Sequence, residues 1–137
     1  MALTLLAGLL TSGCSSHDAD EPGLIDGTEG VTLTVNAWSQ ALANGQGNRT
    51  CSLMDKDTQA ALISETSSAD CLSATAAWAK KHPQSWTITE TDVAIDGDKA
   101  TARYDGNSDA QATAKLLGSS SSLTLRRIES RWTLVTK

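Results

Sequence analysis

Apolar residues recur at helical spacing at the start of the folded region. Val31, Val35, Trp38 and Leu42 follow one another at steps of four, three and four. This spacing predicts one buried face of a helix, and Asn44-Gly45 is a typical stop signal. A helix is therefore expected over 31–44.

Two more helical patterns follow, each with a candidate N-cap. The range 48–64 is predicted as a broken helix, with Asp57 capping its second part. Asp70 is expected to cap a third helix, which runs into Lys80 and Lys81 and is stopped by Pro83.

Beyond Pro83 the apolar positions alternate, which is typical of strands. Asp96-Gly97 and Glu129-Ser130 are the expected hairpin turns. The predicted strands are 86–95, 100–104, 111–117, 123–128 and 131–135. Helices followed by an antiparallel meander predict an α+β fold, with N-terminal helices packed on a curved antiparallel sheet of four to five strands.

An apolar run precedes this domain. Residues 2–10 read ALTLLAGLL, which is too short to cross about 30 Å of hydrocarbon but suits the core of an export signal. A buried helix or a simple cleaved signal are the alternatives. The stretch Leu10-Thr11-Ser12-Gly13-Cys14 resembles the bacterial lipobox, although Thr11 departs from the usual aliphatic residue. The resemblance implies cleavage after residue 13 and acylation of Cys14, which would anchor the chain to the outer face of the cell membrane in the cell envelope.

The next residues predict a tether. The range 14–30 is acidic, poor in apolar side chains and contains Pro22, Gly23, Gly27 and Gly30. The expected organisation is therefore a signal peptide over 1–13, a lipidated cysteine with a flexible tether over 14–30, and one domain over 31–137.

The cysteine count agrees with export. Three cysteines leave one unpaired, and acylation of Cys14 leaves Cys51 and Cys71 as a pair. Outside the cytoplasm such a pair is normally oxidised. A metal site or a reactive thiol is the alternative, but no histidine or further cysteine cluster supports it.

The charge composition limits the classes of molecule that this chain is expected to bind. The net charge is −5, which disfavours a sequence-independent nucleic-acid binder. The C-terminal stretch is nevertheless basic, with Arg126, Arg127 and Arg131 against Glu129. These cations suit either a solvated outer face or an anionic partner.

Several segments resemble small actinobacterial lipoproteins with an NTF2-like (cystatin-like) domain. The segments are "ALANG", "RTCSLMDKDTQAAL", "DCLSATAAW", "DVAIDGDKATARY" and "LTLRRIESRW". The resemblance implies a cone formed by the sheet and a helix, either open as a pocket or filled by side chains. Its expected lining residues are Trp38, Trp78, Trp86, Tyr104 and Trp132.

The favoured function is a membrane-anchored, non-catalytic domain that binds an unidentified protein or small molecule. No catalytic, cofactor or metal-binding motif is visible. The alternative is a small-molecule-binding or isomerase/cyclase-like enzyme that uses the cone. Asp92 and Tyr104 are the residues available for a general base and an oxyanion donor.

Overall fold

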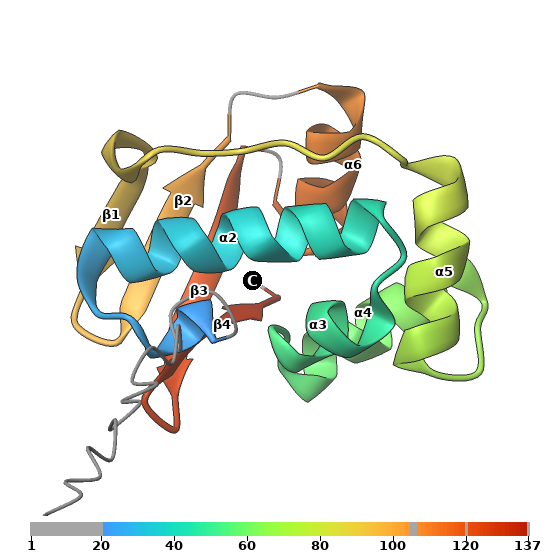
Figure 1. The fold of residues 1–137 in the computed structure, drawn as a ribbon, viewed down its shortest axis with the longest axis horizontal. Helices are drawn as coiled ribbons and strands as arrows, with labels where there is room; N and C mark the ends of the chain where they lie inside the picture. The colour runs from blue at the N-terminus through green and yellow to red at the C-terminus, as the bar shows by residue number, and fades with distance from the viewer. Residues whose placement is uncertain (1–20, 105–106, 120, 137) are drawn as a thin grey trace, which may run out of the picture.

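The sheet carries one long helix across one of its faces (Figure 1). The computed structural model describes residues 21–104, 107–119 and 121–136. Within these residues the fold is α+β, with five α-helices and a four-stranded antiparallel sheet in the order β1-β2-β3-β4. The strands are β1 Val93–Asp96, β2 Lys99–Arg103, β3 Ser122–Ile128 and β4 Arg131–Val135. The helices are α2 Gly27–Ala43, α3 Gly47–Ser52, α4 Lys56–Thr66, α5 Cys71–Lys81 and α6 Ser108–Leu116, with 3-10 turns η1 Pro22–Leu24 and η2 Glu90–Asp92.

The apolar stripe of α2 forms the centre of the core. Val31, Val35 and Trp38 are fully buried, as their spacing predicts. Facing them are the inward residues of β3 and β4, among them Leu125 and Leu134, which lie opposite each other in the sheet. Burial of each aliphatic side chain adds about 1.5–3 kcal/mol to the free energy of unfolding, so this layer supplies much of the stability.

Side-chain caps start the next helices. Asp70 caps α5 by accepting a hydrogen bond from the backbone N–H of Ser73 at 2.7 Å, as predicted. The cap of α4 is Asp55 and not Asp57, since the Asp55 Oδ1 accepts from the backbone N–H of Thr58 at 2.8 Å. Asp57 lies in the first turn, where a negative charge favours the helix without capping it.

The prediction that 14–30 is a tether is wrong for its second half. The 3-10 turn η1 packs on β4, and α2 begins at Gly27, four residues before the first periodic residue. Pro22, Gly23 and Gly30 are buried. A Cβ built on Gly30 would lie 1.7 Å from the carbonyl oxygen of Ile25, so only glycine fits there. Glycine has no side chain to show burial in a sequence pattern. Residues 14–20, including Cys14, lie outside the described residues.

The prediction of a strand over 86–95 is also wrong for its first half. Only Val93–Asp96 forms a strand, while Trp86 and Ile88 lie in an extended segment without a partner strand. The backbone N–H groups of this segment donate hydrogen bonds to side chains of α2 instead. The N–H of Trp86 donates to Ser39 Oγ at 3.0 Å, and the N–H of Ile88 donates to Asn36 Oδ1 at 2.8 Å. Trp86 and Ile88 are still buried, which explains the alternating pattern.

The predicted strand over 111–117 is a helix, α6. Asn107 caps it by accepting from the backbone N–H of Ala110 at 2.9 Å. Its alanines favour a helix, and Ala110 and Ala114, four residues apart, are fully buried. The sheet therefore has four strands.

The outer edge of β4 is covered by the segment between α3 and α4. The N–H of Leu134 donates to the carbonyl of Leu53, and the N–H of Asp55 donates to the carbonyl of Leu134. The hydroxyl of Thr58 also donates to the Leu134 carbonyl, across 76 residues of sequence.

Candidate functional site

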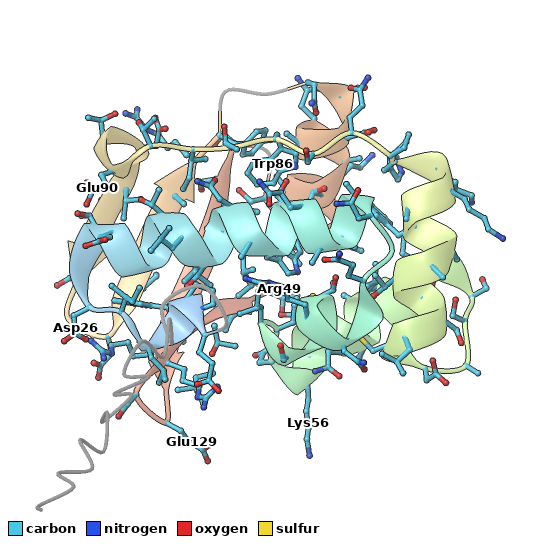
Figure 2. The ribbon with its side chains drawn as sticks, in the orientation of Figure 1. Asp26, Arg49, Lys56, Trp86, Glu90 and Glu129 are labelled. Atoms are coloured by element: carbon cyan, nitrogen blue, oxygen red, sulfur yellow. A yellow bond between two sulfur atoms is a disulfide. The ribbon has the colours of Figure 1, made fainter. Side chains whose placement is uncertain are left out.

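The four tryptophans pack into the interior, which is the filled alternative of the expected cone, and Trp78 also borders a surface groove. Trp38, Trp78, Trp86 and Trp132 are all at least nine-tenths buried. Among the residues expected to line the cone, Trp86 and Tyr104 lie side by side, with their ring centroids 5.9 Å apart. Between Trp78 and Trp86 the packing leaves no room for a water molecule. In Figure 2 Trp86 lies between the extended segment and α2.

Trp132 lies on the far side of the core, next to the N-terminal turn. Its ring approaches the site of Gly30, and the Arg127 guanidinium stands 5.5 Å from the ring centroid. The indole N–H groups of Trp38 and Trp132 are buried and have no hydrogen-bond partner among the described residues.

A surface groove lies between α4, α5 and α6. Its volume is about 560 Å³, within the range of small-molecule sites. Trp78 and Leu116 give it an apolar part, while Glu65 and Lys115 supply opposite charges. The complete lining is Ala61, Ser64, Glu65, Trp78, His82, Ala112, Lys115 and Leu116.

His82 borders this groove and is held by a carboxylate from α6. Its Nδ1 lies 2.9 Å from Asp109 Oδ1, and its ring is 4.3 Å from Trp78 between centroids. Asp109 is 8% exposed, and its Oδ2 accepts from the backbone N–H of Gln84 at 2.9 Å. Because an ionised carboxylate only accepts hydrogen bonds, the imidazole Nδ1 carries the proton in this pair. A neutral imidazole in this tautomer leaves Nε2 as an acceptor.

Pro83 predicted the helix end at which His82 lies, but the partner of His82 was missed. Asp109 comes 27 residues later, between the predicted strands 100–104 and 111–117. The cap Asn107 before an alanine-rich stretch was the available signal for a helix there.

The two residues considered for an enzyme have other roles. Asp92 belongs to a capping box, in which its Oδ2 accepts from the backbone N–H of Thr89 at 2.8 Å. Tyr104 follows β2, and its ring packs against that of Trp86 with the two planes tilted by 49°. Nor does Ser64, the hydroxyl in the groove lining, bond to His82 in the described part of the chain.

The disulfide prediction is confirmed. Cys51 near the end of α3 bonds to Cys71 at the start of α5, with the Cα atoms 6.1 Å apart. This bond ties the two helices together at the end of α5 that lies away from His82.

Other kinds of site have no counterpart in the described ranges. Residues 21–104, 107–119 and 121–136 contain no group of three or more His, Cys, Asp or Glu side chains able to hold a metal ion. The helices described within these ranges are too short or too polar to cross a membrane. Comparison of the chain with models of protein families, with curated proteins and with solved structures finds no match in any of the three.

Proposed function

We propose that this chain is an exported protein, anchored to the outer face of the cell membrane by acyl chains on Cys14, whose α+β domain binds a ligand without catalysing a reaction. The observation that carries the proposal is the Cys51–Cys71 disulfide. It uses two of the three cysteines and is typical of an oxidising compartment. The remaining cysteine is Cys14, which follows Gly13 after an apolar run.

A surface ligand site fits this chain better than an open cone. The tryptophans occupy the interior, whereas the groove over Trp78 is accessible from solvent. Asp109 has a positioning role, since both of its oxygens take part in hydrogen bonds to the protein. The groove suits a small molecule with an apolar part and a charged group, which Lys115 or Glu65 would pair.

We further infer that the domain is a filled relative of the NTF2-like cone. Helices that precede an antiparallel meander, with α2 across the sheet, support this arrangement (Figure 1). The helix α6 between β2 and β3 departs from a simple meander.

Intact mass tests the anchor. The full chain is produced in a bacterium that processes lipoproteins, extracted from membranes and weighed beside the variant Cys14→Ser. We expect the native chain to begin at Cys14 and carry acyl chains, and the variant to lack both changes. An unmodified native chain, or equal membrane retention of the two proteins with no acylation, would contradict the proposal.

A second experiment tests the groove. The probe is 1-anilinonaphthalene-8-sulfonate, which combines aromatic rings with one negative charge. Ala112→Leu should fill the groove and weaken binding at least tenfold, since Ala112 is part of the lining. Ala60→Leu, an exposed position of α4 outside the lining, is the matched control. Equal probe affinity in both variants would remove the groove as the ligand site.

The enzymatic alternative, an isomerase- or cyclase-like protein, needs a titratable residue inside a pocket. The half-buried His82 at the groove is the residue that favours it. Turnover of a small ketone or polyketide-like substrate that disappears in His82→Gln would replace the non-catalytic proposal.

A further inference from the structure

The face of the sheet opposite α2 is open and carries cations. Along β2 and β3, alanine and leucine side chains point to the core and alternate with exposed or half-buried residues, which are polar except for Ile128. The strand register brings these polar residues together on one surface, here called the open sheet face. Its central residues are Lys99, Arg103, Thr124, Arg126, Arg131 and Thr133.

The charge of this face is opposite to that of the whole chain. Four cations stand on it, of which Arg131 pairs with Glu21 and the other three face one β1 carboxylate, Asp96, although the net charge of the chain is −5. Lys99 lies directly opposite Arg126 in the sheet. Like charges in such a pair destabilise a sheet. Among the described residues Lys99, Arg103 and Arg126 form no ion pair.

The polar character of the face limits its partner. Its uncharged residues include the threonines Thr124 and Thr133, which offer hydroxyl groups, and one exposed large aliphatic residue, Ile128, opposite Arg131. One exposed aliphatic side chain gives an apolar helix or a hydrophobic protein surface little area to bury. A flat array of anionic, hydrogen-bonding groups matches both its charge and its hydroxyls.

The described chain begins at the border of the same face. Glu21 pairs with Arg131 at 3.0 Å, and a Cβ on Gly23 would lie 2.9 Å from the Trp132 carbonyl oxygen, so the first turn is held against β4. Seven residue steps separate Cys14 from Glu21. Fully extended, they span at most about 25 Å.

We propose that the open sheet face lies on anionic phospholipid headgroups of the membrane that holds the anchor. This inference rests on the proposed acylation of Cys14. The short connection keeps the β4 side of the domain near the bilayer, and each basic side chain close to an anionic leaflet favours binding roughly fivefold. Acyl chains and a basic surface then act as two signals for one membrane. The groove over Trp78 belongs to the helices beside the sheet and does not share residues with this face.

The test uses the acylated full chain bound to vesicles, with an environment-sensitive fluorophore on one introduced cysteine. Thr124→Cys places the label on the open sheet face, and Gln40→Cys places it on the exposed side of α2. Vesicles of phosphatidylcholine alone are compared with vesicles that also contain phosphatidylglycerol. We expect a blue shift for the Thr124→Cys label on the anionic vesicles, reversed by high salt, and none for the Gln40→Cys label.

Charge-matched variants make the test specific. Lys99→Gln with Arg126→Gln should lower the ratio of docked to undocked protein roughly 30-fold, at about fivefold per charge. Lys80→Gln with Lys81→Gln removes the same charge from the exposed end of α5 and should leave the ratio unchanged. Equal effects of the two pairs, or a shift independent of phosphatidylglycerol, would overturn the proposal.

Two further measurements distinguish failure of this inference from failure of the proposed anchor. Intact mass of the same preparation reports acylation, so an acylated chain without the shift overturns this inference and leaves the proposed anchor standing. A chain without acylation is sedimented with the same vesicles, and failure to bind the anionic ones overturns the inference as well. Binding of heparin that depends on Lys99 and Arg126, without binding to vesicles, would assign the face to a soluble polyanion instead.

Discussion

Asp109 accepts a hydrogen bond from the imidazole of His82 and another from the backbone N–H of Gln84, each at 2.9 Å. One buried carboxylate thus connects α6 with the end of α5 and with the extended segment that follows. Removal of this carboxylate leaves a buried backbone donor without its partner.

Asp109→Ala is therefore expected to lower the free energy of unfolding by about 1–3 kcal/mol. Urea denaturation of the variant and the wild-type protein measures the change. Asp98→Asn, which alters an exposed carboxylate in the β1–β2 turn, is the control and should change stability by less than about 0.5 kcal/mol. Equal losses in both variants would show that Asp109 does not hold these elements.

Gly30→Ala should be among the most damaging small substitutions in this chain. The new Cβ would lie 1.7 Å from the Ile25 carbonyl oxygen, so η1 or α2 must move. We expect a loss of at least about 2 kcal/mol, from overpacking and from weaker packing of the N-terminal turn.

Gly97→Ala provides the comparison. Gly97 has a φ of +58° but open space around the site of a Cβ, so only backbone strain of about 1 kcal/mol is expected. A smaller effect for Gly30→Ala than for Gly97→Ala in thermal unfolding would refute the close packing of the N-terminal turn.

Loss of the disulfide should destabilise the domain strongly. The Cys51–Cys71 bond closes a loop of 20 residues, which stabilises the fold by roughly 3 kcal/mol in the chain-entropy model. The variant with Cys51→Ser and Cys71→Ser should lose that amount in urea denaturation, whereas Cys14→Ser should lose none. Alkylation of both thiols in unfolded, unreduced native protein would contradict the bond itself.

The cap of α5 gives a pH-dependent prediction. The backbone N–H of Ser73 donates to Asp70 and holds the pKa of that carboxyl below its usual value, with the Ser73 side chain adding to the effect. A carboxyl whose pKa is lower in the folded state stabilises the fold above its unfolded pKa. That contribution is lost as the pH falls from about 4 through the folded pKa.

Asp70→Asn keeps a neutral cap and removes this charge. The stability difference between wild-type protein and Asp70→Asn should therefore favour the wild type near neutral pH and shrink in acid, as urea midpoints across the pH range would show. Asp70→Ala removes the cap altogether and should be less stable than Asp70→Asn at every pH. A difference between wild type and Asp70→Asn that does not change with pH would contradict the assignment.

Local signals predicted much of the fold. The spacing of Val31, Val35 and Trp38 predicted α2, Asp70 predicted the start of α5, and Asp96-Gly97 predicted the β1–β2 hairpin. Each of these features depends on residues close together in the chain. Cysteine arithmetic predicted the disulfide because the number of cysteines allowed few pairings.

The sequence-based predictions were wrong where contacts between distant parts of the chain decide the local structure. Alternating burial at Trp86 and Ile88 shows only that the backbone is extended, and side chains of α2 replace the neighbouring strand. Likewise, no local pattern shows whether tryptophans surround a cavity or fill it, or that Asp109 would reach His82. These contacts join elements that are distant in sequence.

The pairing of Leu134 with Leu53 and Asp55 bears on the order in which the chain can fold. The Leu53–Asp55 segment has no partner strand until β4 has been synthesised. Contacts between residues 76 positions apart also form slowly, because a long loop must close first. The Leu53–Asp55 segment therefore reaches its native contacts only after β4 has been made, so the domain completes its fold late in synthesis or after it.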